Sequence, residues 1–495
     1  MADKRELIFS DIAGGRAGWE SPLVRHATDV DLPVATRRSI IAVMVTFWII
    51  ALFGGASRST AAVLEVAFTP AALATALWLW RLSPGAYLSF VWQLFFFTCL
   101  IRRLADLRLG WNAVNPIIVA PYLSALWCGF SLSRPSRVFL RGFGLILLGL
   151  LWAMAIGVVR NGIPAAGFAM LEWGIGPLLA AYLLALPRDS DWVNRALLWT
   201  AIVGVIGMAS YGIVQCLAPA PWDRYWILQA NMAPVIGLEP GRLRIFSTMN
   251  SPWPFGMTLM ALLVFLIGSR GRPGLRALAI GLGLVALIGS QTRAAWGGLV
   301  AGWILLVIIA GRARGALLIG VALLALIGGL TVMVMPSAPG VTARIQTLGS
   351  LSSDDSLYVR VRFYQSFFAE AMEQPIGAGL GRTGVATRLS GDASMLHFDS
   401  GLMNVPFVLG WVGAGVYIAG LAMMIVAVAR RWRQLSPPGL AAAAGCFAVL
   451  SQLIFLNSLI AATGVVFWTL LGVCLKEVRD QSAEAISRRK SVAGK

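Results

Sequence analysis

Charged residues are scarce in this chain. Asp, Glu, Lys and Arg together make up 13% of its 495 residues, whereas an ordinary soluble domain has about 25%. So few charges cannot provide the water-facing surface of a protein of this length. The scarcity therefore excludes an ordinary soluble enzyme or binding domain.

Cysteine is rare as well. The cysteines lie mostly inside apolar runs, far from one another and without CxxC spacing. This distribution argues against a disulfide framework and against a thiolate metal site. We expect them to act as small apolar side chains. They are Cys99, Cys128, Cys216, Cys446 and Cys474.

Long apolar runs dominate instead, since 58% of the residues are hydrophobic. A helix needs about 20 mostly apolar residues to cross a bilayer. The sequence therefore predicts an all-α, polytopic integral membrane protein with about twelve to fourteen transmembrane helices. The candidate spans are residues 39–55, 60–80, 86–101, 113–131, 140–158, 164–186, 196–217, 252–268, 275–292, 294–311, 315–335, 401–429, 437–456 and 460–475.

The net charge of +18 is placed mainly between the apolar runs. Short arginine-rich connections are typical of cytoplasmic loops, and the chain has no long basic soluble segment that would bind nucleic acid. This placement predicts a chain that starts and ends in the cytoplasm. The expected segments are a cytoplasmic tail at 1–38, helices at 39–335 with an outer loop at about 218–250, a large outer loop at 336–400, helices at 401–475 and a basic cytoplasmic tail at 476–495.

One connection disagrees with this pattern. If every candidate span crosses, Arg102, Arg103 and Arg108 face outward, against the positive-inside rule. If residues 60–80 and 113–131 are partial or re-entrant segments, these arginines move inside and the count falls from fourteen to twelve. Both alternatives place residues 218–250, the turn around Arg293 and residues 336–400 outside.

Residues 336–400 form the longest polar insertion of the chain. Loops of this length in a compact protein are usually functional or disordered. The aromatic-rich run 356–373 indicates a packed or interfacial helix, which Pro375 ends before a glycine-rich turn. The sequence therefore predicts a large, partly helical outer loop.

His397 is the one histidine outside the N-terminal tail. An imidazole can act as a general base or acid near neutral pH, and Asp399 lies close enough in sequence to orient the ring. The alternative is an interfacial histidine in a segment that only caps the following helix.

Three arginines stand on the predicted outer side, where arginine is disfavoured. Arg242 and Arg244 end the 218–250 loop, and Arg293 interrupts a long apolar stretch. A guanidinium binds phosphate oxygens in a bidentate manner and keeps its charge. These arginines therefore indicate an anionic ligand. The alternative for one of them is a salt bridge to Asp223 or Glu239.

Acidic residues give weaker signals. Asp354-Asp355, Asp392 and Asp399 could serve a hard cation, but Ser-Ser-Asp-Asp-Ser is better explained as a helix N-terminus, so we expect no metal site. Glu65 and Glu172 lie within apolar runs, where an ionisable residue suggests function. They leave a proton-coupled transporter open as an alternative.

Four short segments occur in order on the predicted outer side. They are Arg244-Ile-Phe-Ser-Thr-Met-Asn250, Gly289-Ser-Gln-Thr-Arg-Ala-Ala-Trp296, Ala393-Ser-Met-Leu-His-Phe-Asp-Ser-Gly-Leu402 followed by Leu409-Gly-Trp-Val-Gly413, and Arg360 with Gln374-Pro-Ile-Gly-Ala-Gly379. In these segments the chain resembles the O-antigen ligase and polysaccharide polymerase superfamily of bacterial membrane glycosyltransferases. The family typically has an Asn soon after its loop histidine, where this chain has Phe398-Asp399.

The resemblance implies an inverting glycosyltransferase that needs no metal or other cofactor. Its donor would be an oligosaccharide linked to undecaprenyl pyrophosphate, used on the periplasmic face of the bacterial inner membrane. Arg244 and Arg293 would clamp the pyrophosphate, and His397 would act on the acceptor hydroxyl. The residues expected to bind substrate are Arg242, Asn250, Arg360 and Asp399.

Within the superfamily, the loop segments favour a polymerase of exopolysaccharide or O-antigen repeats over a ligase that transfers the glycan to lipid A core. Membrane lipids and polysaccharide export or chain-length proteins are the expected partners. A transporter or flippase of polysaccharide precursors is the alternative from a different class.

Overall fold

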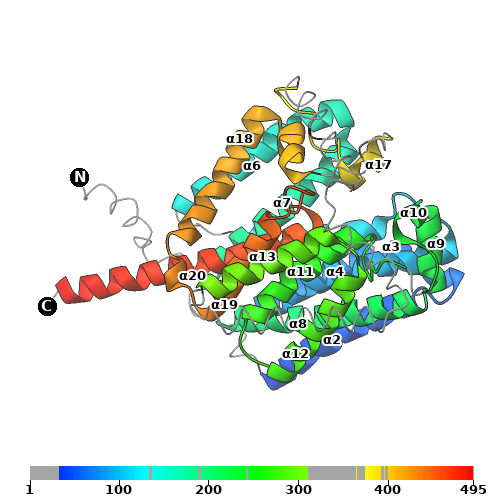
Figure 1. Cartoon of the computed structure of the whole chain (residues 1–495), viewed down its shortest axis with the longest axis horizontal. Coiled ribbons are helices and arrows are strands. Elements are labelled where there is room, and N and C mark those ends of the chain that lie inside the picture. The colour runs from blue at the N-terminus through cyan, green and yellow to red at the C-terminus, as the bar shows by residue number, and fades with distance from the viewer. Residues whose placement is uncertain are drawn as a thin grey trace, which may run out of the picture.

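A computed structural model describes residues 33–132, 137–187, 191–240, 243–309, 364, 374–391, 395 and 400–493. All regular elements in these ranges are helices or short 3-10 turns. The predicted all-α fold is thus confirmed for the part of the chain that the structure describes (Figure 1).

In the ranges that the structure describes, eight helices are long and apolar enough to cross a membrane. This finding confirms a multi-pass membrane protein, while the total of twelve to fourteen spans stays a prediction. The eight are α2 (Val34–Phe53), α3 (Arg58–Leu82), α4 (Pro84–Leu109), α6 (Arg137–Asn161), α7 (Ile163–Ala185), α8 (Asp191–Leu217), α18 (Gly401–Ala429) and α20 (Ala461–Ala493). The shorter apolar helices are α11 (Pro252–Gly268), α12 (Pro273–Gly289), α13 (Arg293–Ile309), α19 (Pro437–Leu450) and the segment 116–131.

The segment 116–131 is broken, although the sequence predicts one span at 113–131. It consists of η1 (Pro116–Val119), α5 (Ala120–Ala125) and η2 (Leu126–Ser131). Pro116 and Pro121 lack the N–H that a continuous helix needs. The Tyr87 hydroxyl lies 3.2 and 2.8 Å from the carbonyl oxygens of Ser124 and Ala125. A side chain thus supplies hydrogen bonding that backbone N–H groups would supply in a continuous helix.

The other described spans lie within a few residues of their predicted bounds. The exceptions are the span predicted at 86–101 and the ends of the last two. The first of these, α4, continues to Leu109 and so contains Arg102, Arg103 and Arg108, which were predicted to lie in a loop. Residues 437–456 form a helix only to Leu450, and the span predicted at 460–475 is the start of α20, which runs on through the basic tail to Ala493. The predicted span 315–335 and most of the loop 336–400 lie outside the described residues.

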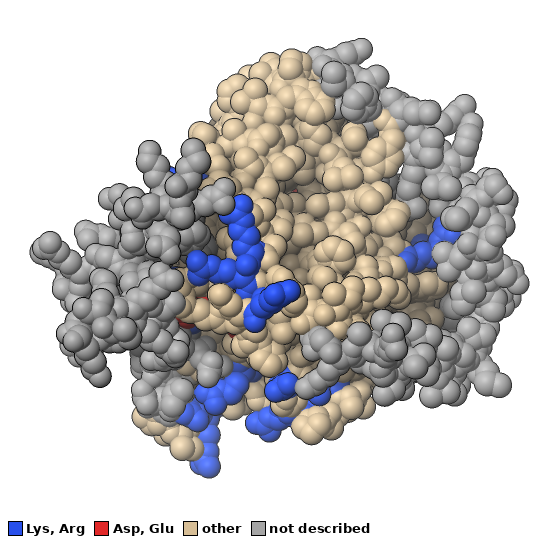
Figure 2. All heavy atoms as spheres, turned by 60° about the vertical axis from the view of Figure 1, so that its left-hand side comes forward, with Lys and Arg blue, Asp and Glu red and all other residues tan. Residues whose placement is uncertain are grey.

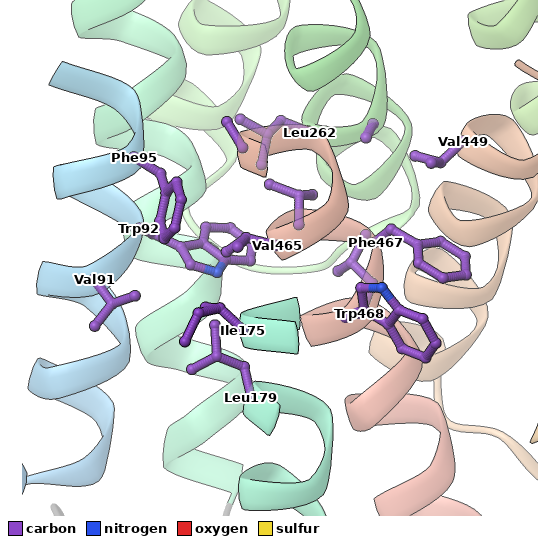
Figure 3. Close-up of a cluster of buried hydrophobic side chains, with 14 of the residues drawn as sticks. Val91, Trp92, Phe95, Ile175, Leu179, Leu262, Val449, Val465, Phe467 and Trp468 are labelled. Carbon is purple, nitrogen blue, oxygen red and sulfur yellow. The ribbon is translucent and has the colours of Figure 1, made fainter. Parts of the chain in front are cut away.

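The core of the bundle forms around α4, α7, α11, α19 and α20. Figure 3 shows side chains of all five converging, among them Trp92, Ile175, Leu262 and Trp468. The most apolar stretch of α20 is 89% buried and that of α4 is 78% buried, against 11% for α2. α20 and α4 are therefore central helices, and α2 lies on the outside.

Glycine lets the central helices approach one another closely. A Cβ atom on Gly176 of α7 would lie 2.2 Å from the Trp468 ring of α20, and one on Gly472 would lie 2.9 Å from Ala180. The same holds between α6 and α18, which lie side by side above the other helices in Figure 1. There a Cβ on Gly149 would meet the Gly413 carbonyl at 2.7 Å.

Connections that are distant in sequence meet at one end of the bundle, which we call the loop end. Arg108 at the C-terminus of α4 donates to the Gly55 carbonyl between α2 and α3. Asn161 at the C-terminus of α6 donates to the carbonyl oxygens of Ala378 and Leu380. Figure 1 shows α9 (Pro221–Gln229), α10 (Ala233–Ile236) and α17 (Thr387–Ser390) on the right, while the C-terminal end of α20 lies on the left. The loop end comprises residues 54–57, 102–115, 218–240, 243–251, 289–293, 374–391, 400 and 451–461.

The position of Arg102 and Arg103 bears on the two predicted topologies. Arg103 forms an ion pair with Asp223 of α9, so the C-terminus of α4 lies at the same end as residues 218–240. This placement agrees with the fourteen-span alternative.

Figure 2 shows a broad area of uncharged residues on one face of the molecule, with Lys and Arg side chains gathered mainly below and to the left of it.

The close approach at Gly176 predicts a local sensitivity to added volume. Gly176→Ala should lower the free energy of unfolding by about 1–3 kcal/mol, because the new methyl group overlaps the Trp468 ring. The measurement is thermal unfolding of the purified protein in detergent. Gly174→Ala is the matched control, since a Cβ there meets nothing closer than 4.0 Å. An equal effect of both substitutions would contradict the packing described here.

Candidate functional site

The two outer arginine segments meet at the loop end. Arg244 donates from Nε to the Ser290 carbonyl at 3.2 Å and from its terminal nitrogens to the carbonyls of Gln291 and Val235 at 3.4 and 3.3 Å. The backbone N–H of Ile245 donates to the Gly289 carbonyl at 3.0 Å. The 243–250 segment is therefore attached directly to the turn that precedes Arg293.

Arg293 is the first residue of α13 and is partly buried. Its position adds the positive end of the helix dipole to a guanidinium, and both favour an anion. Thr292 fixes the turn from the other side, because its hydroxyl donates to the Pro252 carbonyl at 3.2 Å. The start of α11 and the start of α13 are thereby held together.

Both segments contain a residue in the left-handed region. Ser247 and Gln291 each have φ of +53°, which is unusual for residues other than glycine. Such backbone strain costs about 1–3 kcal/mol and clusters at functional sites. At Ser247 the strain is offset by the Gln215 side chain, whose Oε1 accepts from the N–H groups of Phe246 and Ser247.

The 243–254 segment also borders a cavity of about 290 Å³. Asn250, a predicted substrate-binding residue, lies on its wall, and the Asn250 carbonyl accepts a hydrogen bond from the Trp226 indole. Arg102 of α4, Glu172 of α7 and Arg388 of α17 line the same cavity. We call it the arginine cavity.

A buried ion pair supports this end of the structure. The Arg103 guanidinium and the Asp223 carboxylate are both fully buried and in direct contact. Arg103 also donates to the Ser247 carbonyl, and Tyr211 donates to the second Asp223 oxygen at 2.7 Å. Asp223, which the sequence offered as a salt-bridge partner for Arg242, Arg244 or Arg293, is thus paired with Arg103.

Several predicted site residues lie outside the described residues: His397, Asp399, Arg360, Arg242, Asp354, Asp355 and Asp392. Their roles stay predictions. Ser400, which follows Asp399, caps α18 and lies at the loop end, where its hydroxyl bonds to that of Tyr364. In the described ranges, no group of three or more acidic, histidine or cysteine side chains could hold a metal ion.

The two intramembrane glutamates differ in their surroundings. Glu65 accepts hydrogen bonds from Asn112 and Asn115 at 3.3 Å each, so it secures the connection after α4. Glu172 is 8% exposed and lines the arginine cavity, where it is hydrogen-bonded to Tyr122.

The sequence did not single out Arg388 or assign a site role to Arg102. Arg102 carried a signal, because it violates the positive-inside rule in the fourteen-span alternative. Arg388 carried none, since it is one of several arginines in a glycine-rich loop.

No family model matches this chain, and no curated protein matches it.

The Arg103–Asp223 pair predicts a stability effect. Arg103→Gln should lower the free energy of unfolding by about 3–5 kcal/mol, because it leaves Asp223 buried without its counter-ion. Thermal unfolding of the purified protein measures this. Arg108→Gln serves as the control, since Arg108 donates to the Gly55 carbonyl and pairs with no carboxylate of the described residues. A shift no larger than that of the control would show that the pair does not hold the loop end together.

Proposed function

We propose that this protein is a membrane glycosyltransferase that polymerises oligosaccharide repeat units linked to undecaprenyl pyrophosphate. The reaction would take place at the loop end, on the periplasmic face of the inner membrane. The observation that carries the proposal is the attachment of the Arg244 side chain to the carbonyls of Ser290 and Gln291. It joins the two segments that resemble the superfamily.

The chemistry that this arrangement favours is displacement of a pyrophosphate. A hydroxyl of the acceptor glycan attacks the anomeric carbon of the donor, and the bond from that carbon to the pyrophosphate oxygen breaks. The leaving undecaprenyl pyrophosphate keeps the electron pair, and His397 takes the proton of the hydroxyl. Positive charge placed beforehand at the leaving group is usually the largest catalytic contribution.

Arg293 and Arg244 would have different roles in this reaction. Arg293, at the N-terminus of α13, would face the developing negative charge on the pyrophosphate. Arg244 has one hydrogen bond from each of its three nitrogens to a backbone carbonyl. It would therefore mainly hold the turn that presents Arg293. Arginine suits this task because its charge does not depend on pH.

A hydrophobic route for the lipid carrier adjoins the same end. An apolar cavity of about 530 Å³ lies between α2, α4 and α8. Its wall reaches the loop end, and such a surface suits a polyprenyl chain. The wall residues at or next to the loop end are Gly55, Arg108, Tyr211, Trp222 and Thr248.

The transporter alternative has lost part of its support. Glu65, one of the two residues that motivated it, has a structural role through Asn112 and Asn115. The ligase alternative differs from the polymerase only in its acceptor, so an experiment that varies the acceptor distinguishes the two.

Reconstitution with the donor lipid tests the proposal. Purified protein in liposomes with a lipid-pyrophosphate oligosaccharide and a chelator should produce long glycans from that donor alone. Product that forms only after lipid A core is added would identify a ligase instead. Loss of activity on adding the chelator would refute the metal-independent mechanism.

Arg293→Ala should lower the polymerisation rate by about 10²- to 10³-fold, as expected for the loss of one preorganised group at the developing charge. Arg270→Ala, an exposed arginine at the opposite end of α11, should keep the rate of the unsubstituted protein. In cells, Arg293→Ala should leave lipid-linked repeat units on the outer face. Their accumulation on the cytoplasmic face would favour the flippase.

A further inference from the structure

The arginine cavity contains buried polar side-chain groups without hydrogen-bond partners among the described residues. Thr98 of α4 is 2% exposed, and its hydroxyl has no hydrogen-bond partner among the residues that the structure describes. The side-chain oxygen of Asn250 is likewise buried and without a partner. Both residues line the cavity. A buried polar group without a partner is costly, so both groups call for a ligand or ordered water. The Thr98 hydroxyl can donate or accept, whereas the Asn250 oxygen needs a donor.

One guanidinium of the cavity has no ion-pair partner in the described ranges. Arg102 has its own counter-ion, because its Nε lies 3.0 Å from the Asp106 carboxylate. Arg388 forms no ion pair with an acidic residue of the described ranges, and Glu172 across the cavity is too far away for one. Burial, and then the charge of Arg102, lower the pKa of Arg388. The charged form of the Arg388 guanidinium is therefore destabilised here, and a bound anion would stabilise it.

Aromatic rings hold both guanidinium groups. Arg102 lies 4.9 Å from the ring centre of Trp226 and 5.1 Å from that of Trp111, and Arg388 lies 5.8 Å from Trp111. Contacts of this kind fix the direction of a cation without neutralising it. Deeper in the cavity the walls include Tyr122 and Phe168, whose rings stack edge to face at 5.5 Å.

The two kinds of group together select the class of ligand. A fully ionised phosphate or pyrophosphate would satisfy Arg388 and could accept from the Thr98 hydroxyl, but it cannot donate to the side-chain oxygen of Asn250. A neutral sugar would supply hydroxyl donors but leave Arg388 without an anion. A sugar ring with a carboxylate supplies both, and its C–H faces suit aromatic walls.

We propose that the arginine cavity binds an acidic sugar residue of the glycan substrate, with its carboxylate at Arg388 and its hydroxyl groups at Thr98 and Asn250. This inference rests on the proposed function, because it assigns a sugar to a glycan-processing site. Arg388 is then a residue that determines specificity for acidic repeat units, distinct from Arg293 at the pyrophosphate.

Binding of small glycosides tests this proposal without any lipid donor. The probes are methyl β-glucuronide and methyl β-glucoside, which differ in the carboxylate, and binding to the purified protein in nanodiscs is followed by saturation-transfer NMR titration. The glucuronide should bind about tenfold more tightly, as expected for one charge-assisted hydrogen-bonded contact. Arg388→Gln should abolish this difference, and Arg388→Lys should keep most of it.

Arg382→Gln, in the same loop but outside the cavity wall, is the control and should retain the full preference. Thermal unfolding checks that each variant is folded. Equal affinity for the two glycosides, no binding of either, or an Arg388→Gln variant that keeps the preference would overturn the inference. A protein that polymerises lipid-linked repeats but lacks the preference refutes only this inference. A protein that shows the preference but forms no polymer refutes only the proposed function.

Discussion

The buried ion pair between Arg103 and Asp223 is the interaction on which the loop end depends. Both side chains are fully buried, and a buried charge is tolerated only when it is paired and hydrogen-bonded. The pair links α4, a central helix, to α9 in a connection 120 residues later. This link determines which connections share one end of the bundle.

Further contacts extend from this pair to the candidate site. Arg103 donates to the Ser247 carbonyl, and the strained Ser247 is held by Gln215. Three residues before it, Arg244 attaches to the turn at Ser290. Polar groups therefore connect the C-terminal part of α4 to the turn before α13. Interactions of this kind are strong in a low-dielectric interior and fix a single arrangement.

Most of the spans could be predicted from sequence, because the length of an apolar run is set by the thickness of the bilayer. The run at 113–131 could be found but not its shape, since Pro116 and Pro121 interrupt it and the Tyr87 hydroxyl, from another helix, supplies compensating contacts. Local sequence contains no information about a partner that distant.

The candidate site was predicted in part for a similar reason. Arg244 and Arg293 stood out because arginine is rare on the predicted outer side, and the structure brings their segments together. The arginine cavity could not be predicted, since Arg102 and Arg388 lie almost 300 positions apart and only the fold makes them neighbours. His397 lies outside the described residues, so its part in the site stays a prediction.

We expect the connections that bear Arg244, Arg293 and Arg388 to share one side of the membrane. Single cysteines in a cysteine-free variant test it most directly, through labelling of intact cells with a membrane-impermeant maleimide. Val114→Cys and Leu238→Cys, both exposed at the loop end, should be labelled from outside. Arg270→Cys and Gln434→Cys, at the opposite end, should react only after permeabilisation. Labelling of positions 114 and 238 from opposite sides would show that these connections do not share one side of the membrane.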